Sequence, residues 1–327
     1  MSKELINFNK NFNCYFLTVR AILSRKAEIT DLFWNQAAMI STSEEDVFSF
    51  TPYHKSLPEQ LYEYFNIEEK IISTQDFEEF YREVKETTAL GYTILLISDC
   101  YDLPHTLYYQ QRFNHHAVEI FSADEDEVHI VDHYYNYSGS VPKESLRQIL
   151  LSRIDRGEAP GFELIYYKTE EMSVPEVSGF VHTMIDINQT FMRGGDPYQK
   201  PNPHPSRKLG IEAFDEFVHH LEHEVFINRE DNVDISYHCL KELANSRSNY
   251  SHFLLMNRSL SPEMEFMGEG YLVLSNLLQV TANMVLKCFI TKRYDQFHPR
   301  VMKKLNEIRS KELELLNIRL TETIPSC

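Results

Sequence analysis

The sequence predicts an α+β fold in two domains, with a mixed domain over residues 1–168 and a mostly α-helical domain over residues 169–327. Helix and strand patterns alternate as far as Lys168, and beyond this residue the strand patterns stop. A chain of 327 residues is long enough for two domains, since most domains have roughly 100–200 residues. Its hydrophobic content of 43% is sufficient for a core in each domain.

The elements of the mixed domain follow from apolar periodicity and from the residues that begin and end helices. Acidic residues ahead of a helical apolar pattern begin a helix at Thr74, and Pro142 begins another helix that Gly157 ends. Two short apolar runs flank the acidic turn 123–127, which predicts a hairpin with a longer loop. In chain order, we expect helices over 14–23, 74–91 and 142–157, and strands over 92–98, 116–121, 128–132 and 162–167.

Helical spacing of apolar residues continues through the second half of the chain, interrupted by a turn-rich loop over 194–205. The most apolar stretch, residues 270–290, includes polar side chains along its length, so it predicts a buried helix and not a membrane span. Apolar residues at helical spacing include Ile211, Phe214, Phe217, Val218, Leu221 and Val225.

Charge and cysteine content exclude several classes of protein. The net charge of −17 argues against a nucleic-acid partner, because a surface that follows phosphates is basic. The five cysteines are scattered without a CxxC pair, which excludes a disulfide framework and a zinc ribbon. The first residues lack the apolar core of a signal peptide. A cytoplasmic protein without a membrane partner is therefore expected.

No resident metal or cofactor is predicted. The histidine-rich segment 218–224 does not have the HExxH register of a zinc site, so a solvated helix face is expected there. The sequence has no P-loop, and its glycines match no dinucleotide fingerprint.

Three residues at the ends of predicted elements could form a thiol-dependent active site. Cys14 lies where the first helix begins, and a helix N-terminus stabilises negative charge on sulfur. His116 opens one strand of the predicted hairpin and Asp132 closes the other, so the two strand ends are expected side by side. An imidazole can exchange a proton with the thiol, and a carboxylate can orient the imidazole. This pattern is typical of acyl-transfer chemistry through a thiolate.

Each of these residues also has a structural interpretation. Cys14 would then be a small buried apolar residue, His116 an edge histidine and Asp132 a turn former. Cys100, at another strand end, is the rival nucleophile or a core residue. His115 competes with His116 as the base, and alternation along a strand directs the two rings to opposite faces.

Four short segments carry a resemblance to a known family: Ser98-Asp99-Cys100-Tyr101-Asp102-Leu103-Pro104, Tyr108-Tyr109, His115-His116 and Val131-Asp132. Over roughly residues 7–168 the chain resembles the N-terminal domain of the butirosin biosynthesis protein H family. Members of that family are similar to papain-like bacteriocin-processing peptidases and keep their cysteine–histidine–aspartate layout. They transfer an acyl group from a carrier-protein thioester to form an amide, and a related enzyme serves closthioamide assembly. The resemblance implies a papain-like fold for the mixed domain, whereas the helical half resembles the family only loosely.

The resemblance also implies roles for individual residues. Cys14 would be the acylated nucleophile, His116 the acid and base, and Asp132 the residue that orients it. Asp99 and Tyr101 correspond to the D-x-Y-x-L-P stretch of the family. They would line the substrate cleft or support it from beneath.

Two positions depart from the peptidase pattern. The glutamine that supplies the peptidase oxyanion hole is Phe8 here, so Asn9 or Asn7 would donate instead or would cap the loop. The glycine after the peptidase cysteine is Tyr15 here. Both departures argue against proteolysis more than against thiol chemistry.

His115 and Arg247 are the remaining candidates for substrate binding. An arginine can hold a phosphate or a carboxylate, and the alternative for Arg247 is a surface salt bridge. His115 would lie beside the site if His116 is the base.

The function expected from these features is cysteine-dependent acyl transfer in specialised metabolism. The acyl group would move from a phosphopantetheinyl thioester, through S-acyl-Cys14, to an amine. The expected partners are an acyl-carrier or peptidyl-carrier protein and an amine acceptor, and a homo-oligomer is compatible with the sequence. One alternative is a peptidase or thioesterase that uses the same triad with water. The other is a non-enzymatic binding protein on a degenerate peptidase fold.

Overall fold

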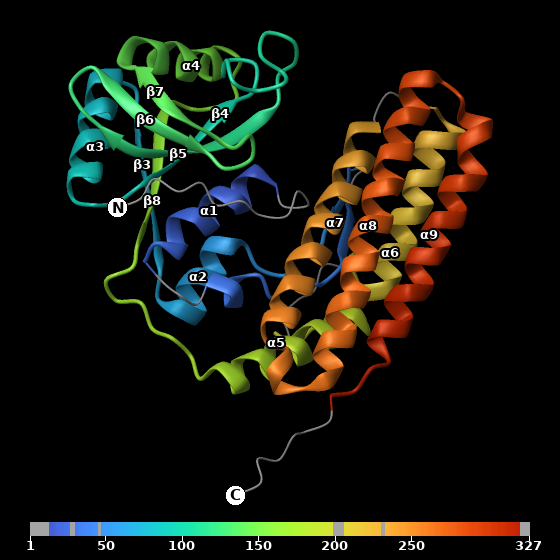
Figure 1. The fold of residues 1–327 in the computed structure, drawn as a ribbon. Coiled ribbons are helices and arrows are strands. Elements are labelled where there is room, and N and C mark those ends of the chain that lie inside the picture. The colour runs from blue at the N-terminus through green and yellow to red at the C-terminus, as the bar shows by residue number, and fades with distance from the viewer. Residues whose placement is uncertain (1–12, 27–29, 45–46, 199–205, 230–232, 321–327) are drawn as a thin grey trace, which may run out of the picture. The chain divides into compact units, whose positions relative to one another are not determined.

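A computed structural model describes residues 13–26, 30–44, 47–198, 206–229 and 233–320 (Figure 1). The chain forms two compact units, each built from segments that are separate in the sequence. Unit 1 comprises Met1–Thr30 and Pro58–Val174, and unit 2 comprises Asp31–Leu57 and Pro175–Cys327. Both helices and sheets are present, so the predicted α+β class is confirmed at that level.

In its described part, unit 1 is built on a six-stranded sheet with the strand order β3-β8-β4-β5-β6-β7. Every neighbouring pair is antiparallel. The strands are β3 (Glu68–Thr74), β4 (Ile94–Asp99), β5 (His115–Ala123), β6 (Glu127–Asp132), β7 (Tyr137–Pro142) and β8 (Phe162–Lys168). The helices are α1 (Cys14–Ser24), α2 (Leu57–Phe65), α3 (Phe77–Ala89) and α4 (Lys143–Asp155).

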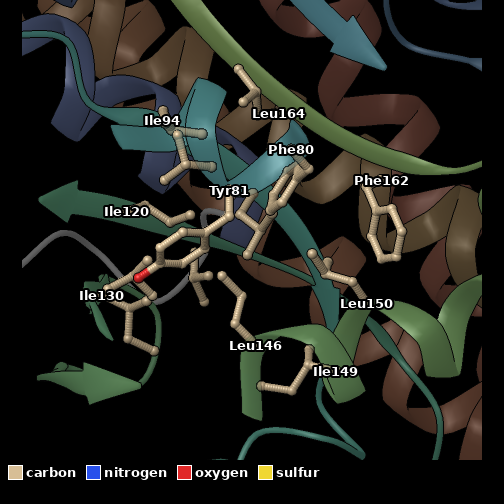
Figure 2. Close-up of a cluster of buried hydrophobic side chains, with 14 of the residues drawn as sticks. Phe80, Tyr81, Ile94, Ile120, Ile130, Leu146, Ile149, Leu150, Phe162 and Leu164 are labelled. Atoms are coloured by element: carbon tan, nitrogen blue, oxygen red, sulfur yellow. The ribbon is translucent and has the colours of Figure 1, made fainter. Parts of the chain in front are cut away.

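The main core of unit 1 lies between the sheet and the helices α3 and α4. Figure 2 shows Phe80 and Tyr81 of α3 and Leu146 of α4 packed with Ile94 and Ile120 of the sheet. Helix α3 begins where Asp76 accepts hydrogen bonds from the amides of Glu78 and Glu79, and these bonds satisfy donors that the helix leaves free.

Helix α1 packs on β4 and β5. Val118 and Ile120 belong to the core with α3 and α4, whereas Thr18 Oγ1 of α1 donates to the carbonyl of Ala117 at 3.2 Å. Because successive residues of a strand face opposite sides of a sheet, α1 covers the other side of β5. This packing fixes the start of α1 near the ends of the central strands.

Unit 2 is mostly helical in its described residues, and α7, α8 and α9 pack side by side (Figure 1). Its helices are α5 (Val177–Met192), α6 (Gly210–Leu221), α7 (Val233–Met256), α8 (Pro262–Thr291) and α9 (Tyr294–Leu316). Shorter turns of helix are η1 (Thr30–Phe33), η2 (Glu222–Ile227, π-helical) and η3 (Arg258–Leu260). A small sheet with the order β2-β1-β9 is formed by β1 (Ile40–Glu44), β2 (Val47–Thr51) and β9 (Lys208–Leu209).

The division of the chain differs from the predicted one, because residues 31–57 belong to unit 2. Strand β1 pairs with β9, so Ile40 lies opposite Leu209. Asn188 of α5 accepts the amide of Ala37 at 2.8 Å. These pairings join segments that are far apart in the sequence. The predicted boundary at 168/169 was based on local patterns, which carry no information about such pairings. The expectation that strands stop after Lys168 is also wrong for the two residues of β9.

Helix α8 contains the apolar stretch 270–290. By length and hydropathy alone it could cross a membrane, and 39% of its most apolar window is buried inside the structure. It packs on α7 and α9 through buried residues such as Leu274, Leu278 and Val285. This packing agrees with the predicted core helix.

Candidate active site

Cys14 is the first residue of α1, as the sequence predicts. Asn13 caps the helix, because its side-chain oxygen accepts the amide of Phe16 at 2.8 Å. The amides at a helix start have no acceptor within the helix, so they favour an anion at this position. Most of the helix is buried from Phe16 to Leu23, whereas Cys14 is half-buried. The thiol is therefore held at a helix N-terminus and stays accessible.

His116 lies at the start of β5 and is 3% exposed. Its Nε2 is 2.7 Å from Oδ2 of Asp132, and the thiols of Cys14 and Cys100 lie near enough to the ring to influence its pKa. Burial alone would lower the pKa of His116, but the hydrogen bond with Asp132 and the interactions with Cys100 and Cys14 outweigh burial and raise the pKa above its ordinary value of 6.5. The ring is thus stabilised in its protonated form, the form that supports a neighbouring thiolate.

Asp132 ends β6 and is fully buried. Its Oδ1 accepts the backbone amides of Tyr134 and Tyr135, each at 3.0 Å. Two histidines share its Oδ2: the Nε2 of His105 lies 2.8 Å from this oxygen, and the Nε2 of His116 lies 2.7 Å from it. Burial alone would raise the pKa of Asp132, but the hydrogen bonds from His105 and His116 hold it well below its ordinary value. The carboxylate is therefore a fixed anion that orients His116.

Aromatic rings enclose the histidines of this site. The ring of His105 stacks on Tyr137 with 4.0 Å between centroids and 4° between planes. The ring of Tyr135 lies 5.3 Å from that of His116, and its hydroxyl is 3.9 Å from Sγ of Cys100. Cys100 is 1% exposed, so of the two thiols near His116, Cys14 is the more accessible.

The structure brings Cys14, His116 and Asp132 together as the sequence predicts, and it distinguishes the two adjacent histidines. His115 is exposed whereas His116 is buried, which agrees with the expected alternation along the strand. The candidate oxyanion donors Asn9 and Asn7 lie outside the described residues.

Asp99 and Tyr101 lie at the end of β4 and just beyond it. Asp99 is buried, and its Oδ1 accepts the amides of Tyr101 and Asn114, so it holds the chain after the strand. This position favours the supporting role over direct substrate contact. Tyr101 packs against Phe113 with 4.2 Å between ring centroids and lines a cavity.

Arg247 is not available for a substrate in this structure. It lies in unit 2, and its side chain is fully buried. Its Nε donates to Glu312 at 2.6 Å, and its Nη1 donates to the carbonyl of Ala38. Neither the predicted substrate contact nor the alternative surface salt bridge is found, because the guanidinium connects three segments inside the unit.

His105 and Tyr135 are the site residues that the sequence analysis missed. Both lie in turns, where no periodicity indicates which way a side chain faces. The available signal was position: His105 directly follows the Ser98–Pro104 segment, and Tyr135 closely follows Asp132. A second buried charged group was also missed, in which Glu119 pairs with Arg25 and with His133.

A group of metal-binding residue types occurs in unit 1, at Asp99, His115 and Glu158. Arg156 already pairs with Glu158 at 2.8 Å and with Asp99 at 3.4 Å. A guanidinium therefore occupies the position from which a metal ion would neutralise these carboxylates.

No protein-family model matches the sequence, and no curated protein matches it.

We expect His116→Ala to slow the alkylation of Cys14 by iodoacetamide at pH 7 by about 10²-fold. The raised pKa of His116 keeps its ring protonated at neutral pH, so its support for the thiolate is present there and is lost as the pH rises above that pKa. Asp132→Asn should cause a similar or smaller loss through a misoriented ring. Mass spectrometry of the labelled peptide gives the rate.

His115→Ala is the matched control, since the adjacent ring is exposed, and it should leave the rate unchanged. If His115→Ala slowed alkylation and His116→Ala did not, the assignment of the base would be wrong by one residue.

Proposed function

We propose that unit 1 is a papain-like cysteine acyltransferase that moves an acyl group from a carrier-protein thioester to an amine. The observation that carries this proposal is the hydrogen-bonded pair His116–Asp132 beside the thiol of Cys14, which lies at the start of α1. A thiolate at a helix N-terminus beside a protonated imidazole is a nucleophile suited to thioesters. The resemblance of residues 98–104 and 131–132 to the butirosin biosynthesis protein H family supports transfer to an amine.

In the first half of the proposed reaction, the thiolate of Cys14 attacks the carbonyl carbon of the thioester. The backbone amides at the start of α1 are donors for the negative oxygen that develops on that carbon. The bond between this carbon and the donor sulfur then breaks. The departing pantetheine thiolate takes the proton of His116, and S-acyl-Cys14 remains.

In the second half, an amine attacks the carbonyl carbon of S-acyl-Cys14. His116, now neutral, accepts a proton from the attacking nitrogen as the bond to sulfur breaks. Cys14 leaves as a thiolate beside the protonated His116, so the initial state is restored. Asp132 remains an anion throughout and holds the ring through Nε2. The products are an amide and a free pantetheine thiol, and the reaction requires no ATP.

The test is intact-mass spectrometry after the protein is mixed with a panel of acyl-pantetheine and acyl-carrier thioesters. A mass increase equal to the acyl group, absent in Cys14→Ala, would support the proposal. If iodoacetamide labelled Cys14 but no thioester of the panel acylated the protein, the tested thioesters would be excluded as acyl donors. If Cys14 were inert to iodoacetamide as well, a non-enzymatic binding protein would be favoured.

We expect S-acyl-Cys14 to persist long enough for detection and to disappear faster when a suitable amine is added. A transferase gains from a long-lived acyl-enzyme, because hydrolysis competes with the amine. The measurement is the lifetime of the acylated mass with and without a panel of amines, together with analysis of the released product. Rapid conversion to the free acid, unaffected by every amine, would assign the triad to a thioesterase or peptidase.

A further inference from the structure

Unit 1 contains a cavity of about 600 Å³ that the proposed reaction does not use. It lies between the loop after β4, the strands β6 and β7, and helix α4. Its size falls within the roughly 300–1,000 Å³ of pockets that bind small molecules. The residues that matter for its chemistry are Tyr101, Asp102, His105, Tyr109, Tyr137 and Ile149.

The lining indicates which ligands would fit. Tyr101, Tyr109 and Tyr137 offer aromatic surface, and Ile149 belongs to the apolar core. No lysine or arginine is among the lining residues, all of which lie in the described part of the chain, and Asp102 contributes a carboxyl group. An anionic ligand would therefore meet no compensating charge, so a neutral ring fits best.

His105 gives this cavity a hydrogen-bonding group of defined direction. Its Nε2 is 2.8 Å from Asp132 Oδ2, and because Asp132 is an anion, this nitrogen carries the proton and donates. The hydrogen bond of His105 within the described residues is made through Nε2, which leaves Nδ1 for a ligand or water. In a neutral ring Nδ1 is an acceptor, so a ligand with a hydroxyl group could donate to it.

The same histidine connects the cavity to the triad. His105 and His116 donate to one oxygen of Asp132, at 2.8 and 2.7 Å. A ligand hydroxyl that donates to Nδ1 would draw electron density from the ring and so make the Nε2–H of His105 a stronger donor. Asp132 Oδ2, which the two histidines share, would then accept less strongly from His116. Occupancy of the cavity would therefore change the support that Cys14 receives.

We propose that this cavity binds a small neutral phenol or aromatic alcohol, and that His105 transmits its binding to the Asp132–His116 pair. The ligand site is independent of the proposed acyl transfer. The coupling depends on Cys14 being an activated thiol but not on the identity of its acyl donor.

Binding is tested with three probes that share one ring: 4-methylphenol, 4-methylanisole and 4-methylbenzoate. Ligand-observed NMR with the full chain should give saturable binding of the phenol. The anisole, which lacks the hydroxyl proton, should bind about fivefold more weakly, and the benzoate should not bind. Equal binding of all three probes, or no binding of the phenol, would overturn the proposal.

The position of the site is tested with a variant that fills the cavity. Ser145 is exposed on α4 and lines the cavity, so Ser145→Trp should abolish binding without disturbing the core. Glu144→Trp is the matched control, because Glu144 is its exposed neighbour and is not among the lining residues. Binding that survives Ser145→Trp would place the probe elsewhere and would refute the assignment.

The coupling is tested by the rate of iodoacetamide labelling at Cys14, measured from pH 5 to 9. Saturating 4-methylphenol should shift the pH profile of the wild-type protein and leave that of His105→Ala unshifted. An equal shift in both proteins, or none in the wild type, would show that His105 does not transmit binding. Because the probes carry no acyl group, failure here is distinguishable from failure to form S-acyl-Cys14.

Discussion

Cys14→Ala is expected to reduce acyl transfer by about four orders of magnitude or more while the protein remains folded. The thiol of Cys14 is the accessible partner of His116 and lies at the start of α1. Without it no S-acyl intermediate can form, and the neighbouring groups can at most position the substrates. The measurement is amide formation from an acyl-pantetheine thioester and an amine. Circular dichroism checks the fold of the variant.

The other cysteines provide controls for this result. Cys239→Ala and Cys288→Ala should retain activity, since both residues belong to unit 2. Cys100→Ala is the sharper control, because the Cys100 thiol also influences the pKa of His116 but is 1% exposed. We expect it to retain acylation at Cys14. Normal turnover by the folded Cys14→Ala variant, or loss of acylation only in Cys100→Ala, would show that Cys14 is not the nucleophile.

Glu312→Ala is expected to lower the free energy of unfolding by about 3–5 kcal/mol, the usual cost of leaving a buried charge without its partner. Arg247 and Glu312 are fully buried, with 2.6 Å between Nε and Oε1. Once the carboxylate is removed, the guanidinium of Arg247 keeps only its weaker contacts, such as those to the carbonyl of Ala38 and to Ser246. Urea denaturation followed by circular dichroism gives the change.

An exposed ion pair between α9 and α6 provides the control. Arg309 of α9 donates two hydrogen bonds to Asp215, at 2.6 and 2.8 Å, and both side chains are exposed by 40% or more. Because water screens such pairs, Asp215→Ala should cost about 0–1 kcal/mol. Similar small losses in the two variants would contradict the assignment of Arg247 as a buried cation that depends on Glu312.

Much of unit 1 could be predicted from local sequence patterns. Helices α1, α3 and α4 and strands β4, β5, β6 and β8 appear close to their expected positions, since each has a strong apolar pattern or a clear end signal. Strands β3 and β7 were not predicted. Their patterns are weak, because β3 exposes Ile71 and β7 includes Ser138, Gly139 and Ser140. These strands depend on pairing with β8 and β6, which no local window contains.

The candidate site was predictable where its residues lie at the ends of regular elements. The positions of Cys14, His116 and Asp132 follow from the start of a helix and the ends of a hairpin. His105 was not predictable in the same way, because its contact with Asp132 is set by the course of a loop. Arg247 was a candidate for substrate binding because an arginine can hold a phosphate or a carboxylate, yet its side chain is completely buried in unit 2.

The path of the chain through both units has a consequence for folding during synthesis. Residues 31–57 leave the ribosome early, but their partners come from much later in the chain, since Ile40 pairs with Leu209 and Ala37 binds Asn188. Until those partners are made, apolar residues such as Phe33, Trp34 and Met39 have nowhere to be buried. Contacts between residues that are far apart in the sequence form slowly. Until they form, the chain exposes hydrophobic segments that are prone to aggregate and that chaperones bind. This path of the chain also means that no cut at a single peptide bond yields either unit intact, so the nascent protein must be nearly complete before unit 2 can form.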